Sequence, residues 1–296
     1  IDYVFEIGLT PNRTDAMGHI GVARDLRAAL LVKGEESPEL IFPKGTYQTE
    51  GNNPIKLTIE SDMCPSYYGT YFTGVQVAES PDWLKNSLTA IGLTPKNNVV
   101  DITNYVLHTF GHPLHAFDSE KLNGHEVVVR QAKKGEKITT LDGVERELST
   151  SDLVIADERK PVCIAGVLGG SDSGVSETTS CVYLESAYFD AVSVRKTAKR
   201  HAINSDASYR YERGVDPNIT AAAHTYAAAL ICELTGATAG PLDHQGSKDF
   251  PKLEITFSFE KVCKLIGVGM SIETASDILK WLDFEIIGLN GDQWTV

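Results

Sequence analysis

The feature that most constrains this 296-residue chain is a succession of short apolar runs, each closed by a turn signal, between residues 56 and 189. Runs of about four to eight residues bounded by glycine, proline or aspartate are typical of strands. Two of these runs are joined by Asp142-Gly143, a strong hairpin signal. The predicted strands cover 56–60, 67–77, 126–132, 136–141, 144–149, 153–157, 161–167 and 181–189.

Helix signals alternate with these strands. Side-chain oxygens of serine and aspartate satisfy the free N–H groups at a helix start, and glycine commonly follows a helix end. The predicted helices are 16–33, 80–92, 99–110, 190–202 and 216–235, with Asp15, Ser80, Asp190 and Asp216 as N-caps. Strands and helices mixed in this way predict an α+β fold with a mixed sheet.

The two ends of the chain carry smaller elements. A strand is predicted at 4–9, and residues 34–55 and 238–252 are rich in glycine, proline and polar residues, as linkers are. Beyond the second linker, the sequence predicts two short helices and a hairpin turned at Asn290-Gly291. A two-stranded ribbon is marginal alone, so we expect the chain to be a fragment of a longer protein.

Composition excludes several classes of protein. The net charge of −13 opposes binding of nucleic acid over the whole surface, so any RNA contact must be local. Five cysteines without a C-x-x-C pair argue against a disulfide framework and a zinc ribbon, and favour a reducing cytoplasm. No apolar run approaches the ~20 residues that span a bilayer, so no membrane association is expected.

A glycine-rich stretch, IAGVLGGSDSGVSETT at 164–179, follows the strand at 161–167. Glycine allows close approach of the backbone, often to phosphate. The stretch lacks the Gly-Lys-Ser/Thr of a Walker loop, and its spacing is not the G-x-G-x-x-G of a dinucleotide fold. The central residue of GSDSG is Asp172 and not the serine of a nucleophile elbow. The loop therefore fits neither phosphate-binding pattern, which makes a phosphate- or nucleotide-binding enzyme the least favoured alternative.

Polar residues in apolar surroundings mark a candidate site. HPLH contains His112 and His115, and one of them is expected to be a hydrogen-bonding site residue, because no ligand pair for a metal accompanies them. Glu185 lies within the apolar VYLESAYF, where a buried carboxylate is costly unless a partner or ligand donates to it. The alternative is that Glu185 lies at a sheet edge and faces water.

A second cluster is basic. SVRKTAKRHA carries Arg195, Lys196, Lys199 and Arg200 on a chain that is otherwise acidic. It is either a solvated helix face or a local docking surface for RNA phosphate. Further along, Arg213 has two interpretations, as a site residue or as part of an internal ion-pair network.

Five blocks of sequence follow one another along nearly the whole chain: GLTPNRTDAMGHIGVARDL, NNVVDITNYVLHTFGHPLHAFD, IAGVLGGSDSGVSETT, LESAYF and RHAINSDASYRYERGVDP. Together these blocks resemble the β-chain of bacterial phenylalanyl-tRNA synthetase. The resemblance implies three parts: 1–42 as the end of the N-terminal (B1-like) domain, 43–247 as the B3/B4 domain, and 248–296 as the start of the B5 domain. It also implies an α-chain partner in an α2β2 heterotetramer, tRNA(Phe), and ATP and Mg²⁺ for the full enzyme, with no cofactor or metal in this chain.

The resemblance further implies an editing site that hydrolyses tyrosyl-tRNA(Phe). Glu185 matches the position that accepts the tyrosine hydroxyl, and His115 and Gly169 match catalytic positions. Ser205 and Ala207 match the wall of the pocket, and the backbone at Gly166 and Gly170 is expected to contact the substrate. Two departures are Thr94, where the family often has arginine, and Ser205, where it often has threonine. A non-catalytic module that braces the α-chain and guides tRNA remains the alternative.

Overall fold

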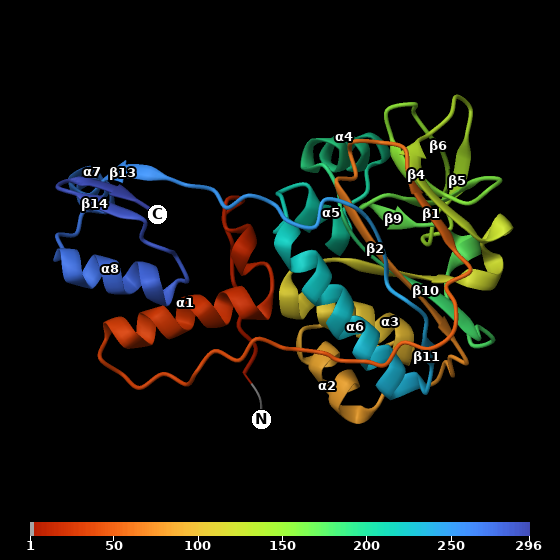
Figure 1. Cartoon of the computed structure of the whole chain (residues 1–296), viewed down its shortest axis with the longest axis horizontal. Helices are drawn as coiled ribbons and strands as arrows, with labels where there is room; N and C mark the ends of the chain where they lie inside the picture. The colour runs from red at the N-terminus through yellow and green to blue at the C-terminus, as the bar shows by residue number, and fades with distance from the viewer. Residues whose placement is uncertain (1–2) are drawn as a thin grey trace. The chain divides into compact units, whose positions relative to one another are not determined.

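The computed structural model describes residues 3–296, which form two compact units (Figure 1). The larger unit contains the described residues up to 18 together with 43–248, and the smaller unit contains 19–42 together with 249–296. Both units combine helices with sheets, so the predicted α+β class is confirmed. The three-part division at 42 and 247 stays a prediction.

The first sheet of the larger unit is antiparallel and has the strand order β11-β2-β10-β3, with β12 also paired to β2. Its strands are β2 (Ser66–Thr73), β3 (Leu114–Asp118), β10 (Cys181–Tyr188), β11 (Thr238–Ala239) and β12 (Asp243–Gly246). The central strand β10 pairs along its full length with β2. Apart from its two end residues, β10 is buried throughout, as a strand covered on both faces must be.

The second sheet has the order β1-β4-β7-β8-β9, and it is mixed because β1 runs parallel to β4 while the other neighbours are antiparallel. Its strands are β1 (Lys56–Ile59), β4 (Glu126–Gln131), β7 (Leu153–Ala156), β8 (Pro161–Ile164) and β9 (Leu168–Gly169). The predicted hairpin is present as β5 (Lys137–Thr139) and β6 (Glu145–Glu147). Gly143 has the positive φ of 77° that its turn requires.

The main core combines buried side chains from both sheets, among them Tyr67, Phe117 and Tyr183 from the first and Val129 and Ile155 from the second. Helices α3 and α6 pack together, and α6 also packs on β2 and β10 (Figure 1). The helices of this unit are α2 (Asp82–Ala90), α3 (Asn98–Phe110), α4 (Ala191–His201), α5 (Asp206–Tyr211) and α6 (Thr220–Thr235). Five short 3₁₀ turns are η1 (Thr14–Ala16), η2 (Ser119–Lys121), η3 (Asn123–His125), η4 (Ser171–Ser173) and η5 (Pro217–Ile219).

The smaller unit packs α1 (His19–Val32) against α8 (Ile272–Trp281) and contains α7 (Phe259–Ile266). Its sheet has the order β13-β15-β14, with strands Thr256–Ser258, Gln293–Thr295 and Gly288–Asn290. Trp294 is fully buried on β15 and stacks on Phe259 with ring centroids 4.8 Å apart. The prediction of a two-stranded ribbon was therefore wrong, because β13 pairs with the other edge of β15.

Several local predictions were also wrong. Residues 4–9 form no strand, because they are largely exposed and no neighbouring strand pairs with them. Asp15 lies inside η1 and not at the start of α1. Ser80 is not an N-cap, because its hydroxyl donates to Asp101 at 2.6 Å while Pro81 occupies the cap position. Finally, the linker predicted at 238–252 contains β11 and β12.

Within the part of the chain that the structure describes, no helix combines the length and the apolar character that crossing a bilayer requires.

Candidate functional site

Four residues lie directly opposite one another in a row across the first sheet: His115 on β3, Glu185 on β10, Gly69 on β2 and Asp243 on β12. Side chains of directly opposed residues extend from the same face of a sheet. This face also carries Tyr67 and Tyr183, which belong to the core between the two sheets. The row therefore places a carboxyl group and an imidazole side by side at the edge of an apolar core.

Glu185 is 4% exposed, which excludes the alternative of a sheet edge facing water. Its Oε2 atom accepts a hydrogen bond of 2.9 Å from the hydroxyl of Tyr67. The hydrogen bonds of residues 3–296 include none to its other oxygen, Oε1, and this atom is not among the enclosed unpaired ones, so it is open to solvent or to a ligand. Burial raises the pKa of this carboxyl to about 8, and the Tyr67 hydrogen bond only partly opposes that rise. When ionised, this carboxyl accepts a hydrogen bond from a ligand, and when protonated it can also donate one.

The hydroxyl of Tyr183 lies over Gly69, the residue opposite Glu185. A Cβ atom at position 69 would collide with that hydroxyl, so glycine is required there. The Tyr183 hydroxyl is buried and has no hydrogen-bond partner in the described structure. Buried polar groups are seldom left unpaired in native proteins, so this hydroxyl is suited to pair with a polar group that enters beside Gly69.

His115 contributes a second unpaired polar atom. The residue is partly buried, but its Nε2 atom is shielded from solvent and has no partner within residues 3–296. Burial lowers the pKa of the ring to about 4, so the imidazole is neutral near pH 7. In a neutral imidazole one ring nitrogen donates and the other accepts, so Nε2 of His115 can bind a polar group or a water molecule in the role that its tautomer sets.

Gly169 on β9 brings the glycine loop to His115. A Cβ atom at position 169 would lie 2.6 Å from Cε1 of His115 and 3.1 Å from Cδ1 of Leu141. Distances below about 3 Å are not tolerated between such atoms, so only glycine leaves the histidine ring in its place. The residue that the loop approaches most closely at this position is therefore His115.

The other two predicted loop glycines serve the fold itself. Gly166 has a φ of 67°, and its Cα faces the side chains of Phe189 and Tyr211. The N–H group of Gly170 donates to the carbonyl of Val162 at 2.8 Å. These contacts explain why glycine occurs at both positions without any contact with a substrate. The substrate contacts predicted for both glycines stay predictions.

Ser205 and Ala207 come close to the loop through α5. The Ser205 side chain caps this helix and takes part in a capping box with Ser208. Its hydroxyl also donates to the carbonyl of Val167 at 2.6 Å, which fixes the start of α5 to the glycine loop. Ala207 packs against the main core. The departure at Thr94 lies elsewhere, on an exposed turn after α2.

Reasoning from the sequence missed Tyr67, Tyr183 and Asp243. The first two occur in tyrosine-containing strands whose pattern indicates a core but does not reveal which hydroxyl meets a carboxyl group. Asp243 belongs to the polar segment DHQG, which has no strand pattern. Only the long-range register places these three residues beside Glu185.

The basic run on α4 divides into two sets. Arg195, Lys196 and Lys199 are exposed to solvent. Arg200 forms an ion pair with the buried carboxylate of Asp152, which His201 also contacts at 2.8 Å. Arg200 therefore ties α4 to the start of β7. The interpretation of Arg213 as part of an internal network is supported by its ion pair with Glu212 and by its position over the Tyr209 ring.

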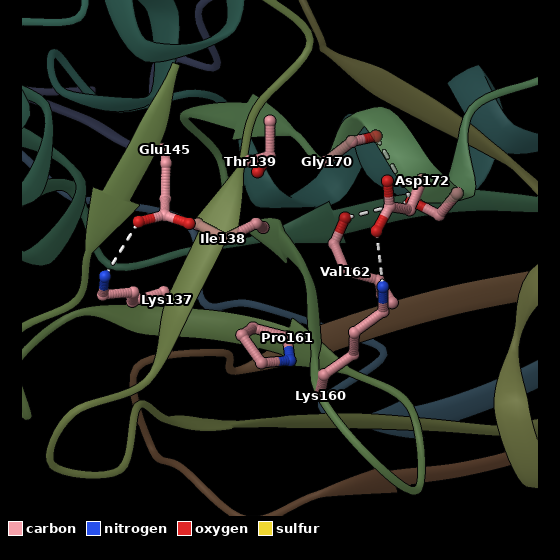
Figure 2. Close-up of a pocket in the computed structure, with 10 residues that line it drawn as sticks. Lys137, Ile138, Thr139, Glu145, Lys160, Pro161, Val162, Gly170 and Asp172 are labelled. Carbon is pink, nitrogen blue, oxygen red and sulfur yellow. Dashed lines mark hydrogen bonds and ion pairs between the residues drawn. The ribbon is translucent and has the colours of Figure 1, made fainter. Parts of the chain in front are cut away.

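A separate surface cavity of about 130 Å³ lies beside the β5–β6 hairpin (Figure 2). It is lined by two ion pairs, Lys160 with Asp172 at 2.5 Å and Lys137 with Glu145 at 2.8 Å. Of the predicted site residues, only Gly170 reaches it. The cavity is smaller than the roughly 300–1,000 Å³ of typical ligand pockets, and it does not contain the Glu185 row.

The described residues contain no group of three or more histidine, cysteine, aspartate or glutamate side chains arranged to hold a metal ion. His112, the other histidine of HPLH, is fully buried with its ring 6.0 Å from that of Tyr211. The expectation that this chain binds no metal stays a prediction.

Comparison with known proteins gives a consistent picture. The B3/4 domain model matches residues 63–236. The phenylalanine–tRNA ligase beta subunit of Bacteroides fragilis is 46% identical over 289 residues, covering 97% of this chain and 35% of that protein. The subunit of Bacteroides thetaiotaomicron is 44% identical over 298 residues, covering 100% of this chain and 36% of that protein. The chain thus spans about a third of the length of these curated relatives.

Among solved structures, an N-terminal fragment of the phenylalanyl-tRNA synthetase beta subunit from Pyrococcus horikoshii matches with a TM-score of 0.45 and 14% sequence identity. The match covers 96% of this chain and 78% of that fragment.

Proposed function

The chain belongs to the B3/4 domain family, and on that premise we propose that it hydrolyses tyrosine wrongly esterified to tRNA(Phe). The resemblance to the phenylalanyl-tRNA synthetase β-chain is confirmed by relatives that carry this name and are 44–46% identical to the chain. The single observation that carries the proposal is the buried Glu185 carboxyl, which has one oxygen bound by Tyr67 and the other without a donor.

Discrimination between phenylalanine and tyrosine explains why such a carboxyl group is useful. An apolar pocket rejects a larger analogue that adds only a hydroxyl by no more than about 10²-fold. A second site that accepts a hydrogen bond from this hydroxyl selects in the opposite direction. Phenylalanine would leave the buried group of Glu185 unpaired, at a cost of about 1–3 kcal/mol, or roughly 5- to 150-fold in rate.

Hydrolysis of the ester needs an oriented water molecule, stabilisation of the oxyanion and departure of the ribose hydroxyl. The neutral ring of His115 lies beside Glu185 in the row, and its unpaired Nε2 atom can hydrogen-bond to this water, as acceptor in the tautomer protonated on Nδ1. Oxyanion contacts from the glycine loop are limited. The N–H groups of Val167 and Gly170 already donate to the carbonyls of Ile164 and Val162.

We propose that the exposed cationic side chains of α4 bind phosphate groups of the tRNA. Arg195, Lys196 and Lys199 project from a helix whose C-terminal end leads into Ser205, the residue bound to the glycine loop. This arrangement supports contact with the acceptor end while the ester lies near Glu185. A local surface of this kind fits a chain whose net charge of −13 repels nucleic acid elsewhere.

The proposal extends to the longer protein of which the relatives are examples. We infer an α-chain partner in an α2β2 heterotetramer, a cytoplasmic location, and aminoacylation with ATP and Mg²⁺ at the α-chain. In this scheme, editing is the contribution of residues 43–247. The alternative, a docking module without activity, gives no account of a carboxyl group buried with one free oxygen.

The test is deacylation of tyrosyl-tRNA(Phe) and phenylalanyl-tRNA(Phe) by this chain and by the assembled ligase. The wild type should hydrolyse the tyrosyl ester faster. Glu185→Ala should abolish that preference, because the buried acceptor is gone, while circular dichroism shows a folded protein. Glu147→Ala, on the exposed strand β6, controls for the loss of one negative charge. An unchanged tyrosine preference in Glu185→Ala would favour the docking module.

A further inference from the structure

Tyr67 is the residue that contacts the carboxyl group of Glu185. It lies on β2, where its Cα is opposite Ala187, two residues along β10 from Glu185. Its side chain is fully buried, and its hydroxyl donates to Oε2 of Glu185 at 2.9 Å. Because both residues extend from the same face of paired strands, this hydrogen bond is set by the sheet register and not by a flexible loop.

The direction of the hydrogen bond follows from the ionisation of the two groups. Burial and the nearby carboxyl group raise the pKa of Tyr67 well above its usual value, so the phenol keeps its proton and donates it to the ionised carboxylate. While Glu185 is ionised, its Oε2 atom is therefore occupied by Tyr67. The remaining acceptor is Oε1, which no described residue contacts through a hydrogen bond.

We propose that Tyr67 is a positioning residue that sets substrate specificity: it fixes the Glu185 carboxyl so that Oε1 is presented to the phenolic hydroxyl of the substrate. The inference rests on the proposed function, because it assigns the same carboxyl group to the tyrosine side chain. It adds a residue that touches no substrate atom and acts only through Glu185. In effect, a tyrosine of the protein occupies one oxygen, and the tyrosine of the substrate occupies the other.

The titration of Glu185 follows from the groups that face it. No described cation forms an ion pair with it, so the Tyr67 hydrogen bond is the interaction that favours its charged form. Burial raises the pKa values of the neighbouring thiols and phenols, and it lowers that of His115 to about 4. The facing groups are Cys64, Tyr67, His115, Cys163, Tyr183, Tyr211 and, across Gly69, Asp243.

The experiment compares Tyr67→Phe with Tyr68→Phe. Tyr68 is the next residue of β2 and faces the other side of the sheet, where its ring lies 4.3 Å from that of His244. Each variant loses one phenolic oxygen from a buried tyrosine. Two quantities are measured: the titration of Glu185 by NMR of ¹³C-carboxyl glutamate, assigned with Glu185→Gln, and the ratio of tyrosyl to phenylalanyl ester deacylation. Spontaneous hydrolysis of each ester is measured without the protein and subtracted before the ratio is taken.

In Tyr67→Phe, the Glu185 titration midpoint should rise by about one pH unit or more, as expected when a charged group loses a hydrogen bond. The ester ratio near pH 8 should fall about tenfold, because the carboxyl group is more often neutral and is free to rotate. Tyr68→Phe should change neither quantity. An unchanged midpoint would overturn the proposal, and so would a shifted midpoint with an unchanged ester ratio.

Failure of the proposed function would look different. The wild type itself would then show no preference for the tyrosyl ester, and Glu185→Ala would deacylate as the wild type does. In that case the tyrosyl ester is not the substrate, and Tyr67 has no role in specificity for it. The NMR titration would still report the Tyr67–Glu185 coupling. The wild type therefore tests the proposed function, and Tyr67→Phe tests the positioning role of Tyr67.

Discussion

The unfolding free energy of Glu185→Gln, relative to that of the wild type, should increase as the pH rises. The substitution keeps the shape of the side chain and an oxygen that accepts from Tyr67, but it removes the ionisable group. In the folded wild type, burial raises the Glu185 pKa from 4.5 to about 8. The folded state therefore binds this proton more tightly than the unfolded state does.

The sign and size of the effect follow from this difference. The proton contributes stability that is fully present below pH 4.5, declines as the pH rises, and is lost above about pH 8. A difference of about 3.5 pKa units at about 1.4 kcal/mol each gives roughly 5 kcal/mol as the full change. The buried amide of glutamine adds a cost of about 1–3 kcal/mol that does not vary with pH. The quantity to compare is therefore the change with pH of the difference in unfolding free energy between the two proteins, and not the size of that difference at one pH.

Urea unfolding of both proteins between pH 4 and pH 9 measures the difference in unfolding free energy. Hydrogen exchange of the β2 and β10 amides shows whether this difference in unfolding free energy arises in the larger unit, which contains both strands. Glu147→Gln, on exposed β6, corrects for the change in net charge. A difference between wild type and Glu185→Gln that stays constant over this range would refute the reasoning, because Glu185 would then titrate alike in the folded and unfolded states.

Three further predictions concern the same site. Gly169→Trp should block deacylation of both esters, because even a Cβ atom at this position meets the His115 ring at 2.6 Å; equal rates for variant and wild type would contradict this. The tyrosyl deacylation rate should show no inflection near pH 6.5, because burial lowers the His115 pKa to about 4; an inflection there that disappears in His115→Gln would contradict it. Elemental analysis of the purified chain should find no stoichiometric zinc or magnesium.

Most of the fold was predictable because its elements carry local signals. The β5–β6 hairpin follows from Asp142-Gly143, and α3 follows from its apolar face and from Gly111 at its C-terminal end. The strand β12 was missed because DHQG is polar and lacks the apolar alternation of a strand, although it pairs with β2. Residues 4–9 have a strand pattern but no neighbouring strand, so the pattern alone did not produce one.

The candidate site was predictable only in part. Glu185 attracts notice because a carboxylate inside an apolar strand needs a partner. The identity of that partner depends on the register between β10 and β2, which joins segments more than a hundred residues apart. The same holds for Gly69, which is an ordinary glycine in the sequence and is required only because the Tyr183 hydroxyl lies over it. Contacts of this kind join residues that are far apart in the sequence, so local sequence patterns do not predict them.

The row across β3, β10, β2 and β12 has a consequence for how the molecule folds. Its four residues come from distant parts of the chain, so long loops must close before they meet. Folds dominated by such non-local pairings form slowly, because the loops must close before the contacts are made. During synthesis the row cannot be complete until β12 has left the ribosome. Until then the edge of β2 that carries Gly69 has no β12 strand paired to it, so the first sheet of a nascent chain is still open on that side.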